Sequence, residues 1–274
     1  MNIEEIKSLM AQGYITDSTI LRDDVVKVIE AMDEKTFLEK YVTNRGSIID
    51  VVNSKGEEVT LHDIFKNGGE IVLSSNILLD ESLVIPTGKE VVLDLNGKTI
   101  SNKSDNSATD VIVVNDGGKL TINGNGKIVA VGGNDGFAVI AEGEVTILGG
   151  DFETGIDQNG EGNACIYARK NGKVRIEGGS FKGQNNCLLI NKKDSDRATT
   201  VIECVGGKYY NFNPADNGSE TTGGGSGHGT NFVPEGYMVV ESKEGKSTVY
   251  TVVEGAPVKE ETNEEVPAVD PVEE

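Results

Sequence analysis

The sequence predicts a mainly β protein, a right-handed parallel β-helix (solenoid) with a helical N-terminal arm and a C-terminal β-hairpin. Three observations carry this prediction. The 274 residues include 35 glycines, no tryptophan and 5% aromatics, a composition that suits short strands and tight turns. The pattern Gly-Gly-polar-aromatic recurs as GGDF, GGSF and GGKY. Short β runs separated by Gly, Asn and Asp return at similar intervals, which indicates an internal structural repeat.

Residues 1–45 are expected to form a helical arm for attachment or oligomerisation. Apolar residues recur there at helical spacing, and two interpretations of this stripe stay open. The stripe packs against the chain's own body, or it makes docking and oligomer contacts with other proteins. The candidate contact residues are Ile3, Ile6, Leu9, Met10, Val25, Val26, Ile29, Met32, Phe37, Leu38 and Tyr41.

Residues 46–69 are expected to hold a linker strand within SIIDVV and then a capping helix. The helix is predicted from Thr60-Leu61-His62-Asp63, a capping-box pattern, and from Gly68-Gly69, a glycine stop. An open stack of strands exposes unpaired backbone groups at its end. We therefore expect this helix to cover the first coil.

Residues 70–213 are predicted to form the β-helix itself. The residues that close successive glycine turns are separated by 28, 24, 29 and 28 positions, and they are Ile100, Ile128, Phe152, Phe181 and Tyr209. This period is too short for a propeller blade, and the helices of leucine-rich or ankyrin arrays are missing. In a parallel β-helix each strand pairs with the same strand one coil away. Phe152, Phe181 and Tyr209 should then form one inward column, with a glycine pair turning the corner before each.

Residues 214–255 are expected to form a flexible glycine-rich loop and a hairpin, MVVES and TVYTVV, which caps or flanks the last coil. Residues 256–274 are acidic and proline-rich, and we expect a disordered tail. The three cysteines, Cys165, Cys187 and Cys204, lie in apolar runs without CxxC spacing. We expect buried reduced thiols, with Cys165 and Cys187 one above the other.

The net charge of −20 argues against nucleic acid or an anionic membrane as partner, because both would be repelled. No apolar run is long enough to span a bilayer. The start, MNIEEIKSLMAQG, lacks the basic and apolar parts of a secretion signal, so we expect synthesis in a cytoplasm.

Three patterns are candidates for catalytic sites. Gly227-His228-Gly229 matches the GHG of polygalacturonases, but the adjacent aspartates that such a site needs occur only at Asp23-Asp24, in the arm. Asp194-Ser195-Asp196-Arg197 supplies the calcium ligands and the arginine base of a lyase, yet it falls in an inserted loop, where charges usually keep a turn solvated. Glycoside hydrolysis needs two carboxylates roughly 5 to 9 Å apart. Acids spread among turn and outward positions leave a pair across coils open: Asp94, Asp116, Asp151 and Glu177.

Basic residues concentrate in the later coils, where they form a docking face or simply solvate the turns; they are Arg169, Lys170, Lys173, Arg175, Lys182, Lys192, Lys193 and Arg197. The lack of tryptophan disfavours a sugar groove built on aromatic platforms. We predict no catalytic residue, cofactor or metal, while the enzyme question stays open.

Three phrases carry a resemblance to a known family: IFKNGGEIVLSSNILLDESLVIPTGKEVVLDLNGKTI, the GGxF coils, and GTNFVPEGYMVV with STVYTVV. Over residues 58–253 the chain resembles the pectate-lyase-like β-helix domains in surface appendages of tailed bacteriophages, including head fibres and decoration proteins, and in some gut bacterial surface proteins.

This resemblance implies a non-enzymatic protein of the virion surface, made in the host cytoplasm. The arm would dock on capsid or other virion proteins, and the rod would project as a dimer or trimer toward a bacterial surface glycan. The alternatives are a tail-associated polysaccharide depolymerase, either lyase or hydrolase, and a bacterial surface adhesin.

Overall fold

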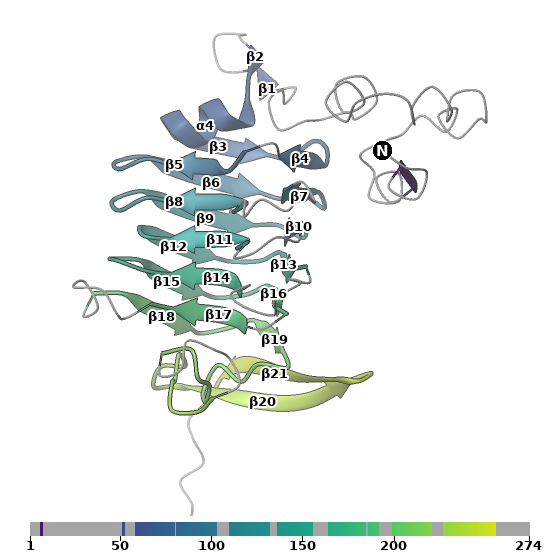
Figure 1. The fold of residues 1–274 in the computed structure, drawn as a ribbon, viewed down its shortest axis with the longest axis vertical. Coiled ribbons are helices and arrows are strands. Elements are labelled where there is room, and N and C mark those ends of the chain that lie inside the picture. The colour runs from purple at the N-terminus through teal and green to yellow at the C-terminus, as the bar shows by residue number, and fades with distance from the viewer. Residues whose placement is uncertain are drawn as a thin grey trace, which may run out of the picture.

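The computed structural model shows a parallel β-helix whose coils stack into a rod (Figure 1). It describes residues 6–7, 51–52, 58–79, 81–102, 110–131, 136–155, 164–184, 186–191, 199–220 and 227–255. Ile6 and Lys7 are helical. The rest of the predicted arm, the loop 192–198 and the tail 256–274 lie outside the described residues, so the predictions made for them stay predictions.

Each full coil gives one strand to each of three faces, in the order face 1, face 2, face 3. Face 1 is formed by β3 (Gly69–Val72), β6 (Glu90–Asp94), β9 (Lys119–Asn123), β12 (Glu144–Ile147), β15 (Lys173–Ile176) and β18 (Val201–Cys204). Face 2 is formed by β4 (Ile77–Leu79), β7 (Thr99–Asn102), β10 (Lys127–Ala130), β13 (Asp151–Thr154), β16 (Ser180–Lys182) and β19 (Lys208–Tyr210). Face 3 is formed by β5 (Leu83–Ile85), β8 (Ile112–Val114), β11 (Val139–Ala141), β14 (Ala164–Ala168) and β17 (Asn186–Ile190). All of these neighbours pair in parallel, as the sequence predicted.

The predicted core column is present on face 2. Phe152 pairs with Ile128 on one side and Phe181 on the other, and Phe181 pairs with Tyr209. The rings of Phe152, Phe181 and Tyr209 stack, with centroid distances of 5.0 and 5.1 Å and interplanar angles of 9° and 10°. All three side chains are fully buried, so the repeat spacing encodes a core column.

The two glycines of each pair have different tasks. The second glycine has a positive φ, 90° at Gly179 and 92° at Gly207, a conformation that residues with a Cβ rarely adopt. The first glycine lets two coils approach: a Cβ at Gly206 would lie 2.0 Å from the carbonyl oxygen of Glu177, and one at Gly178 would lie 2.4 Å from that of Leu148. The predicted corner is confirmed. The sequence indicated the turn but not the close approach of two coils at the first glycine.

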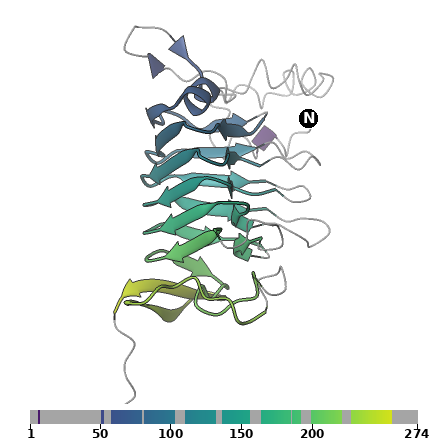
Figure 2. The ribbon, with the colours of Figure 1, turned by 90° about the vertical axis from the view of Figure 1, so that its left-hand side faces the viewer.

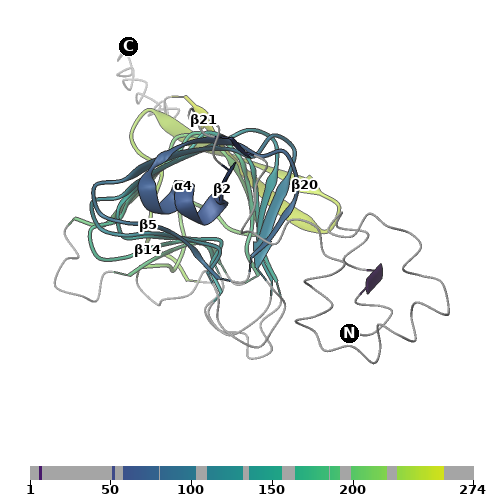
Figure 3. The ribbon, with the colours of Figure 1, turned by 90° about the horizontal axis from the view of Figure 1, so that it is seen from above.

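The N-terminal end of the rod is covered by α4 (Leu61–Asn67), which lies across the first coil when viewed from above (Figure 3). The predicted capping box is present: the Asp63 amide donates to Thr60 Oγ1 at 3.0 Å, and the Thr60 amide donates to Asp63 Oδ2 at 3.2 Å. Hydrogen bonds from Thr60 lower the pKa of the Asp63 carboxyl. Leu61, Ile64 and Phe65 are buried in the rod's core. Ahead of the helix, β1 (Val51–Val52) pairs antiparallel with β2 (Glu58–Val59).

The C-terminal end is closed by the predicted hairpin, β20 (Tyr237–Glu244) and β21 (Ser247–Glu254) (Figures 1 and 2). Strand β21 pairs antiparallel with β19, through Tyr209 and Tyr250 for example. The hairpin therefore extends face 2 and reverses its strand direction.

The glycine-rich loop that precedes the hairpin is predicted to be flexible, because it has no periodic apolar face. Residues 221–226 lie outside the described residues, and the chain on both sides of them packs on the rod. Phe212 and Phe232 belong to the core cluster. Asn217 and Thr230 exchange backbone hydrogen bonds of 3.0 and 2.8 Å, and Ser219 Oγ donates to the Leu188 carbonyl at 2.7 Å. The described ends of this segment therefore form part of the cap, and the predicted flexibility stays a prediction.

Candidate functional site

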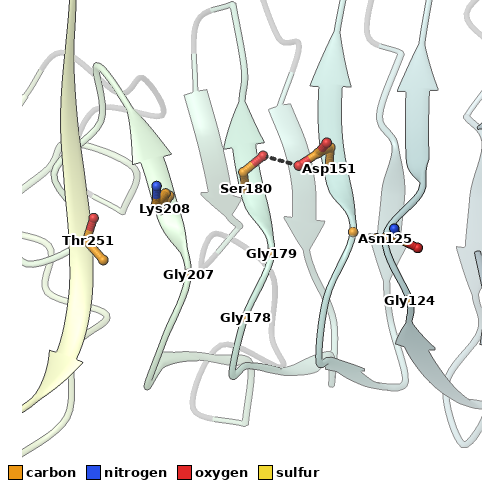
Figure 4. Close-up of a pocket in the computed structure, with 10 residues that line it drawn as sticks. Gly124, Asn125, Asp151, Gly178, Gly179, Ser180, Gly207, Lys208 and Thr251 are labelled. Carbon is orange, nitrogen blue, oxygen red and sulfur yellow. Dashed lines mark hydrogen bonds between the residues drawn. The ribbon is translucent and has the colours of Figure 1, made fainter. Parts of the chain in front are cut away.

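An open groove of about 470 Å³ runs along the glycine corners beside face 2 (Figure 4). Because the corner residues are glycines, backbone forms much of its floor. Its lining residues are Gly124, Asn125, Gly150, Asp151, Gly178, Gly179, Ser180, Gly207, Lys208 and Thr251. The sequence predicts only that these glycines turn corners, so the groove beside them is a finding of the structure.

The side chains that line the groove rise from equivalent positions of consecutive strands. Asp151, Ser180, Lys208 and Thr251 are successive register partners on β13, β16, β19 and β21. Ser180 Oγ donates to Asp151 Oδ1 at 2.5 Å, and in Figure 4 these two side chains point toward each other. Lys208 Nζ lies 3.5 Å from Glu244 Oε1. The row thus offers carboxylate, hydroxyl and ammonium groups whose step is the strand spacing of about 4.8 Å, and the amide of Asn125 also lines the groove.

Among the described lining residues, Asp151 is the one carboxylate. Hydrolysis of a glycosidic bond by the usual acid and base mechanism needs two. The lining therefore suits binding of a polar, extended chain better than its cleavage.

The four carboxylates considered in the sequence each have a separate partner. Oxygens of Asp94 and Asp116 accept hydrogen bonds from the Asn96 amide at 2.8 Å and from Asn171 Nδ2 at 3.0 Å. Asp151 accepts the hydrogen bond from Ser180, and Glu177 pairs with Arg175 Nε at 2.7 Å. None of these four contacts joins one of the carboxylates to another.

The described basic residues are interspersed with acids. The carboxylate of Glu142, 8% exposed, receives Arg169 Nε and Lys170 Nζ, each at 2.7 Å. Arg175 bridges Glu177 and Glu203 across neighbouring coils. The Lys182 ammonium lies 4.6 Å from the centroid of the Tyr210 ring. These contacts favour the interpretation of solvated, paired charge over a positive docking face.

The histidine of the GHG tripeptide lies on the surface of the C-terminal cap. His228 Nδ1 lies 2.8 Å from Asp216 Oδ2, and the two side chains are 83% and 50% exposed. A hydrogen bond from the Gly229 amide and then the contact with His228 lower the pKa of the Asp216 carboxyl. This pair closes the loop between Asn217 and Thr230. The adjacent aspartates that a polygalacturonase site needs are not near His228 in the sequence.

The three cysteines are buried and free, as predicted. Cys165 and Cys187 occupy equivalent positions on β14 and β17, because the flanking residues are in register. Cys165 Sγ donates to the Phe152 carbonyl at 3.2 Å and Cys187 Sγ to the Phe181 carbonyl at 3.1 Å. Burial raises the pKa of Cys187 and that of Cys204 to about 12. Cys165 and Cys187 are therefore core thiols of face 3 that bond to the backbone of the aromatic column, while Cys204 lies in the core on face 1.

Sequence reasoning missed an apolar row on the outer side of face 3. Register places Val84, Val113, Ile140, Tyr167 and Leu189 in one line. Phe137 packs on this row, with its ring 4.7 Å from that of Tyr167. The sequence carries a signal for this row, because the outward positions of these short strands are apolar as well as the inward ones.

Of the candidate arm contacts, Ile6 is the one described residue, and it is fully buried. Within the described part of the chain, no group of three or more His, Cys, Asp or Glu side chains could hold a metal ion. No helix there is long and apolar enough to cross a membrane. Comparisons with protein-family models, with curated proteins and with solved structures found no match.

Proposed function

We propose that this chain is a non-enzymatic structural protein on the surface of a tailed bacteriophage particle, a head fibre or capsid decoration. It attaches to capsid or other virion proteins through its N-terminal arm and projects the β-helix outward. The observation that carries the proposal is the closure of the rod. Its apolar core runs without a break from Phe65 of α4 to Val252 of the hairpin, and each end is covered by an element of its own.

Closure matters because a projecting appendage has to be stable without a neighbouring protein that covers its ends. An uncovered β-helix end would expose both apolar side chains and unpaired strand edges. Here α4 covers one end and the hairpin covers the other, so no neighbouring protein has to cover them. The resemblance of residues 58–253 to phage surface appendages supplies the biological setting.

The groove beside face 2 supports an adhesive role for the projecting rod. Its regular row of polar groups fits an extended bacterial surface glycan, whose hydroxyl groups recur along the chain. A tail-associated depolymerase is the alternative, and the groove would be its site. The single carboxylate Asp151 among the described lining residues favours adhesion.

Electron microscopy and mass spectrometry of particles made with and without the protein test the proposal. We expect the chain in purified virions at a fixed copy number, and projections that disappear when its gene is deleted. Identical particle surfaces and no copies in the virion would contradict it.

A polysaccharide panel separates adhesion from cleavage. Adhesion predicts retention of a surface glycan without release of oligosaccharides, and weaker retention by Asp151→Asn. Release of oligosaccharides by the parent protein, lost in Asp151→Asn, would establish the depolymerase instead.

A further inference from the structure

We propose that the floor of the groove beside face 2 is a row of backbone N–H donors, which binds the acetamido carbonyl groups of a neutral bacterial surface glycan. Three glycines that line the groove form this row: Gly150, Gly179 and Gly207. They lie on consecutive coils, each directly before a strand of face 2. The choice of a glycan as ligand rests on the adhesive role proposed above, whereas the donor row rests on the structure alone.

These glycines use their carbonyl groups in the strand ladder but not their N–H groups. The three carbonyl oxygens accept backbone hydrogen bonds of 2.9, 2.9 and 3.1 Å. In the described part of the chain, no atom accepts a hydrogen bond from the N–H of Gly150, Gly179 or Gly207. At Gly207 the Val252 amide donates to the glycine carbonyl, but the return bond of a regular antiparallel pair is not made. A φ of 92° turns the Gly207 N–H out of the ladder.

The Tyr209 hydroxyl fixes the direction of the Gly207 N–H. Tyr209 is fully buried, and its hydroxyl donates to the Gly206 carbonyl at 2.9 Å. This carbonyl therefore faces the core. The C=O and N–H of a trans peptide point in opposite directions, and the described residues contain no cis peptide. The Gly207 N–H consequently faces away from the core, into the groove that Gly207 lines (Figure 4).

The two earlier coils repeat this backbone conformation. The φ values of Gly150 and Gly179 are 96° and 90°, close to that of Gly207. A Cβ at Gly207 would lie 3.3 Å from Phe181 Cε2 and 3.4 Å from the Gly178 carbonyl oxygen, so this carbonyl also lies beside a core ring. The N–H of the following residue, Gly179, then faces the groove. The floor thus presents three donors in line, one per coil, at the strand spacing of about 4.8 Å.

Three donors in line select a ligand that presents acceptor oxygens along an extended chain. The net charge of −20 repels an anionic chain. The two charged residues among the described lining, Asp151 and Lys208, have opposite signs. A neutral acceptor therefore fits this groove better than a phosphate or a carboxylate. The acetamido group of an amino sugar supplies one, because its carbonyl oxygen accepts from the floor while its N–H can donate to Asp151.

A matched pair of sugar hexamers tests the ligand. Chitohexaose and cellohexaose share one backbone and linkage, and an acetamido group replaces one hydroxyl on each sugar of the former. Calorimetric titration of the full chain should show roughly tenfold tighter binding of chitohexaose. Ser180→Trp, which fills the groove, should weaken this binding by a similar factor. Thr146→Trp, at a half-buried outward position of β12 on face 1, should leave it unchanged. Equal binding of the two hexamers, tighter binding of cellohexaose, no binding of either, or an unaltered affinity of Ser180→Trp would overturn the ligand.

Amide hydrogen exchange, followed by NMR on the unaltered protein, tests the donor row itself. The amides of Gly150, Gly179 and Gly207 should exchange at least roughly tenfold faster than those of Gly118 and Gly172, which donate hydrogen bonds of 2.8 and 3.0 Å. Chitohexaose should shift the first three resonances and not the other two. Equal protection of the two sets would overturn the donor row. Chitohexaose binding by a chain that is absent from purified virions would contradict the proposed function and leave this site standing.

Discussion

At the scale of single residues, the aromatic column shows how the repeat is translated into packing. Phe181 stacks between Phe152 and Tyr209 at 5.0 and 5.1 Å. Its position followed from sequence spacing alone, because a parallel stack puts equivalent residues above one another. The hydroxyl of Tyr209 required one more contact, a hydrogen bond of 2.9 Å to the Gly206 carbonyl, which spacing could not reveal.

Phe181→Ala should lower the free energy of unfolding by about 3 to 5 kcal/mol, because it removes the central ring and leaves a cavity between two others. Urea unfolding followed by circular dichroism measures the loss. Lys246→Ala, at the exposed hairpin turn, is the control and should stay within about 0.5 kcal/mol of the parent. An equal effect of the two substitutions would contradict the buried stack.

The buried thiols predict a dependence of stability on alkaline pH. Burial raises the pKa of Cys187 to about 12, whereas an unfolded thiol titrates near about 8.5. Below pH 8.5 both states are protonated and the contribution is fully present. As pH rises from about 8.5 to 12, the unfolded state loses protons first, so stability should fall by on the order of 1 kcal/mol per pH unit for each such thiol.

Cys187→Ala isolates this contribution from the titration of lysines and tyrosines. The variant should be less stable than the parent at pH 8, because a buried side chain is lost, and should lose less stability between pH 8 and 10.5. Urea unfolding at the two pH values gives both numbers. A parallel pH dependence in parent and variant would show that Cys187 is not buried as described.

At the scale of elements, the glycine pairs separate what sequence can and cannot predict. Positive φ at Gly207 was foreseeable, because a glycine at a sharp corner favours it. The approach of Gly206 to the Glu177 carbonyl depends on two coils and could not be foreseen from one segment. The salt bridges from Arg169 and Lys170 to Glu142 were accessible in principle, since the separations of 27 and 28 residues match one coil.

Gly206→Ala should destabilise the rod more than Gly88→Ala. The added methyl group at Gly206 meets backbone at 2.0 Å, while at Gly88, with φ 73°, nothing lies within 4 Å. The second change therefore costs only the strain of a left-handed residue, about 1 to 2 kcal/mol. Thermal unfolding of both variants gives the order, and a larger loss for Gly88→Ala would refute the close approach of the coils.

At the scale of the whole molecule, the sequence predicted the rod and its caps better than its surfaces. Periodicity identifies what points inward, and the strands from Ile71 to Tyr210 are regular enough to show it. Within the C-terminal cap, the packing of Phe212 and Phe232 in the core could not be predicted, because glycine-rich sequence separates them. The groove was missed because it is made of backbone at corners, where residue identity says little about exposed shape.

The outer strand of the hairpin predicts how the rod avoids pairing through its exposed sheet edge. Strand β20 ends the face 2 sheet, and Glu241 and Lys243 on it are exposed. Charges on an edge strand discourage pairing with another chain. Replacing both residues with Thr keeps the net charge and should cause association that grows with concentration, measured by sedimentation velocity.

The control for the edge is a charge pair inside a sheet. Lys119 and Glu144 lie on neighbouring strands of face 1 and bond at 2.8 Å. Changing both to Thr removes the same charges without touching an edge, so the sedimentation coefficient should match the parent. Association of this control to the same degree would mean that the charges on the edge strand are not what prevents pairing through that edge.

The corners of the coil differ in their tolerance of added chain. From face 1 to face 2 the glycine pairs hold successive coils at contact distance. From face 2 to face 3, β16 and β17 are separated by residues 183–185, while β7 and β8 are separated by residues 103–111. All four strands still pair in parallel with the strand of a neighbouring coil on their own face. The corner from face 2 to face 3 is therefore the position where inserted residues should be tolerated. A foreign peptide placed between β16 and β17 would be presented sideways from a stiff shaft, at a height chosen by the coil that carries it.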